Sequence, residues 1–162
     1  MKSITLQPIG TIHTPFKDLE GMPIQPSGAV GVVGRVVVND DYAEGLNDID
    51  GFSHIILIYQ FHHSEGFNLT VKPFLDNHPR GLFATRAPRR PNPIGLSVVA
   101  LTGRNGNVLH VRGIDVLDGT PLLDIKPFVP AFDAPTVTAV GWLADKAQHT
   151  DRVKADDRFK TP

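Results

Sequence analysis

The stretch Leu96–Ile114, LSVVALTGRNGNVLHVRGI, contains two short strand-like segments separated by a turn sequence. The segments Leu96–Gly103 and Asn107–Ile114 are rich in β-branched residues and are bounded by turn formers. Between them, Asn105-Gly106 can adopt the positive φ angles that a tight hairpin turn requires. The stretch therefore predicts an antiparallel β-hairpin.

Two further segments have the same character: AVGVVGRVVV, residues 29–38, and SHIILIYQF, residues 53–61. Helical patterns are few and short, NDDYAEGLNDI at 39–49 and GWLADKAQHT at 141–150. Many short strands with little helix between them favour a barrel or sandwich over a parallel α/β sheet. The predicted fold is mainly β, a small antiparallel β-barrel with few short helices.

The 162 residues, 41% of them hydrophobic and 20% charged, predict one globular domain. We assign residues 1–140 to a single barrel domain and residues 141–162 to a C-terminal helix or flexible tail. No apolar run is long enough for a membrane span, and the N-terminus does not resemble a signal peptide. We therefore expect a cytoplasmic protein. The absence of cysteine excludes disulfides and cysteine-based zinc sites.

The segment TRAPRRPNPIGLS, residues 85–97, combines three arginines with three prolines and is called the Arg–Pro loop below. Prolines fix their own φ and bias the preceding residues towards extended geometry, so the loop should be stiff. Arginine offers a planar fork of donors that suits carboxylate or phosphate groups. The alternatives are a surface loop with solvated charges or a polyproline-type ligand for another domain. The net charge of −1 means that any basic footprint is local.

A second candidate region is GIDVLDGTPLLDIKPFVP, residues 113–130, which places Asp115, Asp118 and Asp124 within ten residues. Asp118-Gly119 is a turn signal, and an Asx turn is the simplest role for Asp118 taken alone. The functional alternative is that these carboxylates and the loop backbone bind hydroxyls or amines of a ligand.

A third candidate is His62-His63 in YQFHHSEGF. Adjacent residues on a strand point to opposite faces, so the two histidines would not share one metal, and Glu65 does not complete a known zinc spacing. No metal site is predicted, and the pair is interpreted as a pocket rim. Walker and Gly-x-Ser-x-Gly motifs are absent from the sequence.

The segments FATRAPRRPNPIGLS, residues 83–97, and DVLDGTPLLDIKPFVP, residues 115–130, resemble the TsaA-like family in order, spacing and composition. Members are tRNA (adenine-N6)-methyltransferases that act on N6-threonylcarbamoyladenosine at position 37. The resemblance extends from Ile9 to Pro130 and implies a small β-barrel, S-adenosyl-L-methionine as cofactor, a homodimer and the tRNA anticodon loop as partner. Bacterial members carry a C-terminal extension that assists tRNA recognition; this chain ends at Pro162 without an obvious counterpart, so we expect a short form.

The resemblance also implies a set of cofactor contacts. Matched motif by motif, they are Pro23, Ile24, Gln25, His62, His63, Arg86, Leu96, Asp115, Val116, Leu117 and Asp118. We expect Arg89, Arg90 and Lys126 to bind RNA.

Methylation of an adenine N6 atom needs an acceptor for the amine proton, and Asp118 or Asp124 is the predicted acceptor. An unpaired base could stack on Phe128 or Phe132, which otherwise belong to the core. Two other functions remain open at this stage: an S-adenosylmethionine-dependent methyltransferase with another RNA or a small-molecule acceptor, and a non-catalytic cofactor-binding or interaction module.

Overall fold

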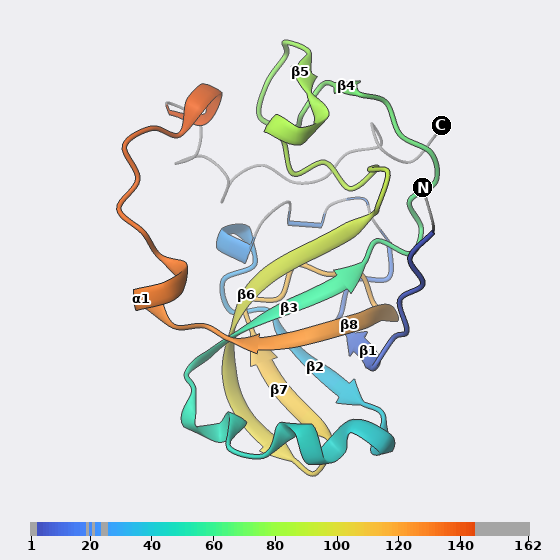
Figure 1. Cartoon of the computed structure of the whole chain (residues 1–162), viewed down its shortest axis with the longest axis vertical. Helices are drawn as coiled ribbons and strands as arrows, with labels where there is room; N and C mark the ends of the chain where they lie inside the picture. Colours follow the sequence, from blue (N-terminus) through green and yellow to red (C-terminus); the bar gives the residue numbers. More distant parts are fainter. Residues whose placement is uncertain (1–2, 19, 21, 24–25, 145–162) are drawn as a thin grey trace.

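The computed structural model describes residues 3–18, 20, 22–23 and 26–144. Eight strands are present in this part of the chain (Figure 1): β1 Gly10–His13, β2 Val33–Val38, β3 His54–Gln60, β4 Thr70–Val71, β5 Arg80–Gly81, β6 Ile94–Asn105, β7 Val108–Arg112 and β8 Thr120–Pro127. Six of them close into a barrel in the order β1-β2-β7-β6-β3-β8, and all neighbouring strands are antiparallel. The predicted fold class is confirmed.

The predicted hairpin is the β6–β7 pair. Asn105 lies opposite Val108, so the turn has two residues, and Gly106 has a φ of 59°. The Arg104 Nε atom donates to the Gly106 carbonyl at 2.7 Å and fixes the turn further. Strand β6 is longer than predicted because it begins at Ile94, inside the Arg–Pro loop.

Other strand limits differ from the prediction for local reasons. Residues 29–32 form a turn instead of the start of β2: Val32 N–H donates to the Ala29 carbonyl at 2.9 Å and Gly31 has a φ of 84°. Strand β1 was not predicted, and of β8 only an extended start at Thr120-Pro121 was expected. Strand β1 has four residues and includes Gly10, where an added Cβ would lie 2.3 Å from the Val37 carbonyl oxygen. Strand β8 contains two prolines, which weaken a sequence-based strand signal.

Across the described ranges, helical structure is limited to short turns. The predicted helix at 39–49 is a pair of 3-10 helices, η2 Asp40–Leu46 and η3 Ile49–Gly51. The other helical segments are η1 Pro26–Gly28, η4 Leu82–Ala84, α1 Pro130–Asp133 and η5 Gly141–Leu143. Only the first turn of the helix predicted at 141–150 is therefore seen, and the remainder lies outside the described residues. No helix in the described ranges is long and apolar enough to span a membrane.

The core is formed by inward-facing residues that alternate along the strands. On β3, for example, Ile55, Leu57 and Tyr59 are buried, and they pack with Ile12, Val36, Val99, Leu109, Val111 and Leu122 from the other strands. One end of the barrel carries the β6–β7 turn together with η2 and η3 (Figure 1). The opposite end carries the longer connections that hold most of the predicted functional residues, whereas Asp124 and Lys126 lie on β8.

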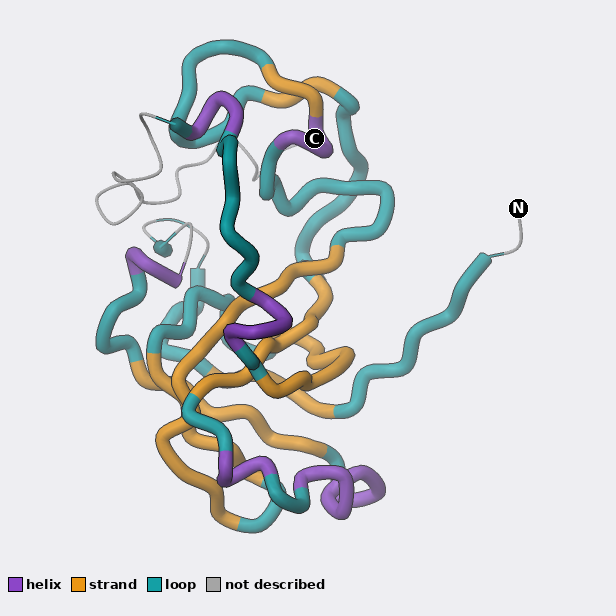
Figure 2. The backbone as a smooth tube through the Cα atoms, turned by 60° about the vertical axis from the view of Figure 1, so that its left-hand side comes forward, coloured by secondary structure: helices purple, strands orange, loops and turns teal. Residues whose placement is uncertain are grey.

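A small two-stranded sheet, β4–β5, stands beyond this second end of the barrel. Its turn is held by Asp76, whose buried carboxylate accepts two hydrogen bonds from Arg80 at 2.6 and 2.9 Å. The chain after α1 runs outside the barrel towards this sheet (Figure 2). There Trp142 Nε1 donates to the Ala84 carbonyl at 2.8 Å, and the Arg80 guanidinium lies 5.5 Å from the Trp142 ring centroid.

Candidate functional site

Strand pairing brings three separate loops to one end of the barrel. Gln60, the last residue of β3, lies opposite Ile94 at the start of β6, while Tyr59 lies opposite Leu122 near the start of β8. The histidine pair, the Arg–Pro loop and the β7–β8 loop at 113–119 therefore meet here. We call this the site end of the barrel.

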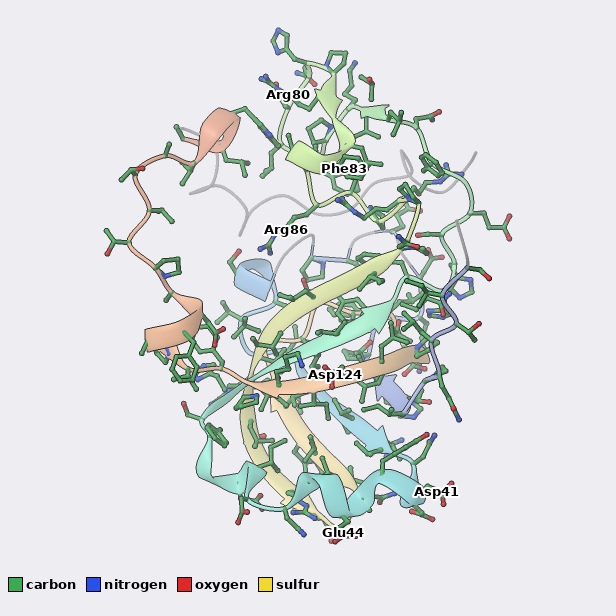
Figure 3. All side chains as sticks on the ribbon, viewed as in Figure 1. Asp41, Glu44, Arg80, Phe83, Arg86 and Asp124 are labelled. Atoms are coloured by element: carbon green, nitrogen blue, oxygen red, sulfur yellow. The ribbon has the colours of Figure 1, made fainter. Side chains whose placement is uncertain are left out.

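Asp115, in the β7–β8 loop, is a half-buried carboxylate of the site end. Ser97 Oγ donates to Asp115 Oδ1 at 2.6 Å, and Tyr59 Oη lies 2.9 Å from Ser97 Oγ. Burial raises the pKa of Asp115 to about 6, against the hydrogen bond from Ser97 and the positive charge of Arg86, which lower it. Arg86 lies between the β4–β5 sheet and the barrel (Figure 3). Its positive charge lowers the pKa of Asp115, although the two residues, both predicted cofactor contacts, are 29 positions apart in the sequence.

Gly95 explains how Tyr59 reaches Ser97. An added Cβ at Gly95 would lie 2.2 Å from Tyr59 Cε2 and 2.9 Å from Phe61 Cζ. The tyrosine ring therefore lies across the glycine on the neighbouring strand. The Tyr59 and Phe61 rings pack edge to face, with centroids 5.5 Å apart. The Tyr59 ring thus occupies the position that a Cβ atom at Gly95 would take.

The histidine pair follows β3 in a turn, so the strand argument that placed the two rings on opposite faces does not apply. Their ring centroids are 4.2 Å apart. His62 Nδ1 lies 3.3 Å from Thr120 Oγ1, which donates to the Leu117 carbonyl at 2.7 Å. Burial, followed by the charge of His63, lowers the pKa of His62. The pair thus adjoins the β7–β8 loop, and the described residues hold no cluster suited to a metal ion.

The remaining predicted cofactor residues occupy different environments. Leu96 is 49% exposed on β6, whereas Val116 is buried in the core and presents its carbonyl to Thr14 Oγ1 at 2.7 Å. Leu117 and Pro23 are half-buried. Ile24 and Gln25 lie outside the described residues, although the helix η1 that follows them packs against β6.

Asp118 is an ion-paired residue that links the β7–β8 loop to the end of β1. Its carboxylate accepts the Thr14 N–H at 3.0 Å, pairs with Lys17 and lies 3.4 Å from His13 Nδ1. The hydrogen bonds from Lys17 and Thr14 lower the pKa of Asp118 to about 2. The Asx-turn role considered from sequence is replaced by contacts with β1 and the residues after it.

Asp124, the other predicted proton acceptor, lies on the wall of the barrel in β8 (Figure 3). It accepts the Ile125 N–H at 2.9 Å, and its Oδ2 atom lies 2.8 Å from Lys126 Nζ. The hydrogen bond to Asp124 and its charge raise the pKa of Lys126. Asp124 pairs with Lys126, Asp115 with Ser97 and Asp118 with Lys17, so the three carboxylates have separate partners.

The two arginines predicted to bind RNA also hold the Arg–Pro loop in shape. Arg89 Nε donates to the Glu65 carbonyl at 2.8 Å, which ties this loop to the loop after the histidines. Arg90 donates to the Thr85 carbonyl at 3.0 Å, and its guanidinium lies 5.7 Å from the ring centroid of Phe83. Phe83 itself is 72% exposed. The stiffness expected from the prolines is therefore reinforced by arginine–backbone bonds.

Sequence reasoning missed Tyr59, Ser97 and Gly95 as parts of the site. A signal was present: alternation along β3 places Tyr59 on the same face as Ile55 and Leu57, and a buried tyrosine hydroxyl needs a partner. Ser97 is likewise the one polar residue within the apolar run LSVVAL, residues 96–101. The pairing register that joins them cannot be read from either segment alone.

Comparison with known proteins identifies the family. The model of the tRNA-methyltransferase O N-terminal domain matches residues 11–134. A probable S-adenosyl-L-methionine-binding protein of Pyrococcus abyssi is 51% identical, with 96% of this chain and 85% of that protein covered. The human tRNA (adenine(37)-N6)-methyltransferase is 31% identical over 98% of this chain and 38% of its own length.

Solved structures agree with the sequence relatives. The crystal structure of TrmO from Pseudomonas aeruginosa has a TM-score of 0.73 and 36% identity, and the alignment covers 87% of this chain and 63% of that chain. The chain thus spans somewhat less than two thirds of that bacterial protein. With a family match over most of its length and a matching barrel, the chain belongs to the tRNA-methyltransferase O N-terminal domain family.

Proposed function

We propose that this protein transfers a methyl group from S-adenosyl-L-methionine to the N6 atom of N6-threonylcarbamoyladenosine at position 37 of tRNA. Its relatives are named tRNA (adenine(37)-N6)-methyltransferases or S-adenosyl-L-methionine-binding proteins. The observation that carries the proposal is the meeting of Arg86, Asp115 and the histidine pair at one end of the barrel. A cytoplasmic location and a homodimer stay predictions.

The chemistry of the site end fits such a cofactor. The Asp115 carboxylate can accept a hydrogen bond from an ammonium or hydroxyl group, and the Arg86 guanidinium can donate to a carboxylate. Leu96 offers an exposed apolar side chain on the adjoining strand. Asp115, Arg86 and Leu96 could therefore contact both the amino-acid group and the nucleoside of the cofactor.

When bound, the cofactor supplies an electrophilic methyl group, and the protein's part is orientation. The Arg–Pro loop is held by its prolines and by Arg89 and Arg90, so the backbone that carries Arg86 is positioned before any ligand binds. The residues at 113–119 are held by Asp118 N–H donating to the Phe16 carbonyl at 2.8 Å and Gly119 N–H to the Ile12 carbonyl at 2.9 Å. Orientation by rigid loops accounts for most of the expected rate gain.

The amine proton needs an acceptor, and Asp118 and Asp124 stay the proposed candidates. Both carboxylates are ion-paired to a lysine, Asp118 to Lys17 and Asp124 to Lys126. With a pKa of about 2, Asp118 is a weak base, so it would accept a proton only from a strongly acidic group. The N6 atom becomes cationic as it attacks the methyl group, and a proton on such a nitrogen is strongly acidic.

Calorimetric titration of S-adenosyl-L-methionine into the wild type, Arg86→Ala and Arg112→Ala tests the proposed site. Arg112 is exposed on β7 and provides a matched loss of one positive charge. We expect saturable binding in the wild type and Arg112→Ala, and binding about tenfold or more weaker in Arg86→Ala. Equal affinity in all three proteins would place the cofactor away from the Arg–Pro loop.

A folded wild type that binds no cofactor would contradict the proposal itself. Tight binding without methyl transfer to tRNA bearing N6-threonylcarbamoyladenosine would instead favour a cofactor-binding module. That alternative draws support from the Pyrococcus abyssi relative, whose name describes binding alone.

A further inference from the structure

A polar chain runs through the otherwise apolar interior at the site end of the barrel. Tyr59 from β3 is 4% exposed and Ser97 from β6 is 1% exposed, and together they lead to Asp115 in the β7–β8 loop. Burying hydroxyl groups in an apolar core is unfavourable unless they are hydrogen-bonded. In the described part of the chain every buried polar side-chain atom has a partner. The three residues therefore form a complete network.

The network has a direction. An ionised carboxylate only accepts hydrogen bonds, so Ser97 Oγ–H donates to Asp115 across their 2.6 Å contact. The serine oxygen can then accept the hydrogen of Tyr59 Oη at 2.9 Å. Burial, followed by the charge of Asp115, raises the pKa of Tyr59, which keeps its hydroxyl protonated and able to donate. Both hydroxyl hydrogens thus point towards Asp115.

The network occupies one oxygen of the carboxylate. Ser97 binds Oδ1, and the backbone N–H of Asp115 also donates to the carboxylate, while no other side chain among the described residues is seen to donate to it. A carboxylate has about four acceptor positions on its two oxygens, so Asp115 keeps acceptor capacity for a ligand at the site end. Gly95 is part of the same arrangement because only a residue without a Cβ lets the Tyr59 ring reach Ser97.

We propose that Tyr59 and Ser97 are positioning residues of the cofactor site, which orient Asp115 and keep it ionised so that its carboxylate accepts a hydrogen bond from an ammonium or hydroxyl group of the cofactor. The inference rests on the proposed function, because it takes Asp115 as a cofactor contact. It adds Tyr59 and Ser97 from the barrel wall, which act on the ligand only through Asp115.

Protonation of Asp115 removes the acceptor, so cofactor affinity should fall as the pH drops through the Asp115 pKa of about 6. The groups that act on Asp115 are Tyr59 and Ser97 from the barrel wall and Arg86 from the Arg–Pro loop. Burial, followed by the charge of His63, lowers the pKa of His62 at the edge of the same site. Loss of either hydroxyl weakens a hydrogen bond that favours the ionised form, which should move the midpoint of binding to higher pH.

The experiment is calorimetric titration of S-adenosyl-L-methionine between pH 4.5 and pH 7, using the full chain as wild type, Tyr59→Phe, Ser97→Ala and Asp115→Asn. We expect midpoints higher by about half a pH unit or more in Tyr59→Phe and Ser97→Ala, with affinity at pH 5.5 about three- to tenfold below wild type. Asp115→Asn should bind weakly at every pH and show no such midpoint, which separates Asp115 from the histidines.

Tyr42→Phe is the matched control, because the chain has two tyrosines and Tyr42 is exposed on η2 at the opposite end of the barrel. It should behave as wild type. A second readout needs no ligand: the Asp115 carboxyl carbon, followed by NMR in the unliganded proteins, should titrate at higher pH in Ser97→Ala than in wild type. Melting temperatures show whether each variant is folded.

Wild-type pH profiles in both Tyr59→Phe and Ser97→Ala, with binding lost in Asp115→Asn, would overturn the positioning role and leave the proposed function intact. Wild-type binding in Asp115→Asn would also overturn it, because Asp115 would not contact the cofactor. Failure of the wild type to bind would remove both proposals together.

Discussion

Two aspartates three residues apart, Asp115 and Asp118, have pKa values displaced in opposite directions. Asp115 is half-buried beside the Ser97 hydroxyl, and its burial raises its pKa to about 6. Asp118 faces Lys17 and the Thr14 amide, and these donors lower its pKa to about 2. The same DVLD sequence thus holds one carboxylate that we propose as a cofactor contact and one that ties the loop to β1.

The raised pKa of Asp115 makes a prediction about stability. Between the unfolded value of 3.8 and about 6 the native state binds more protons than the unfolded state, so this group's contribution to the free energy of unfolding decreases as the pH rises. The contribution is fully present below the unfolded pKa and lost through pH 6, up to about 3 kcal/mol. Asp115→Asn should lack this decrease, which urea unfolding at pH 4 and pH 7 measures. Equal pH dependence in both proteins would show that Asp115 titrates normally.

Variants of Asp118 and Lys17 can distinguish a role of Asp118 as proton acceptor from a role in holding the β7–β8 loop. Asp118→Asn should reduce turnover at least tenfold with cofactor affinity nearly unchanged, because it removes the proposed proton acceptor. Lys17→Ala is the matched control, since it breaks the same ion pair and keeps the carboxylate. Steady-state methylation of tRNA with both variants is the measurement. Equal turnover in the two variants would assign Asp118 to loop support alone.

At the residue scale, sequence reasoning identified the charged side chains of the site end and missed its two buried hydroxyl groups. Arg86, Asp115 and His62 stood out because charge, proline and turn signals surround them. Ser97 and Tyr59 did not, because a single hydroxyl in an apolar strand resembles ordinary core. Their role depends on the register that pairs Leu57 with Ser97 and Tyr59 with Gly95.

At the scale of elements, turn chemistry made the β6–β7 hairpin predictable, while short or proline-containing strands were not. Asn105-Gly106 forms the two-residue turn with Gly106 at positive φ. Strands β1 and β8 depend on tertiary pairing: β1 is four residues long, and β8 pairs with both β1 and β3 in the closed barrel. A barrel was predictable as a class, but the identity of its closing strands was not.

Gly95→Ala tests how β3 and β6 pack at the site end. The new methyl group would overlap the Tyr59 ring, with less than 3 Å between it and ring carbons, so the ring must move away from Ser97. We expect a loss of about 1–3 kcal/mol in the free energy of unfolding, measured by urea denaturation. Gly103→Ala, on the same strand with open space around its Cβ position, is the control. Equal stability of the two variants would contradict the packing described for Tyr59.

At the scale of the whole molecule, the net charge of −1 gives no general attraction to RNA, so a local surface must provide it. The arginines of the Arg–Pro loop stand at the site end, next to the exposed Phe83 ring. The hydrogen bonds of Arg89 and Arg90 to backbone carbonyls fix where these two charges are presented. The sequence revealed the charge cluster, whereas the action of Arg86 on Asp115 required the fold.

The salt dependence of tRNA binding tests this surface. Each phosphate contact contributes roughly 0.7–0.9 to the slope of log affinity against log salt, so Arg89→Ala with Arg90→Ala should lower the slope by about 1.5. Arg35→Ala with Arg112→Ala removes two exposed arginines from β2 and β7 and should leave the slope unchanged. Filter binding at several salt concentrations gives the slopes. Identical slopes for the two double variants would remove Arg89 and Arg90 from the RNA contact.

The most direct test of the central claim is mass spectrometry of tRNA nucleosides after incubation of the wild-type protein with S-adenosyl-L-methionine and tRNA that carries N6-threonylcarbamoyladenosine. The account predicts that this nucleoside gains one methyl group at N6 and that Arg86→Ala reduces the product. An unmodified nucleoside, from a wild-type protein shown to bind the cofactor, would contradict it.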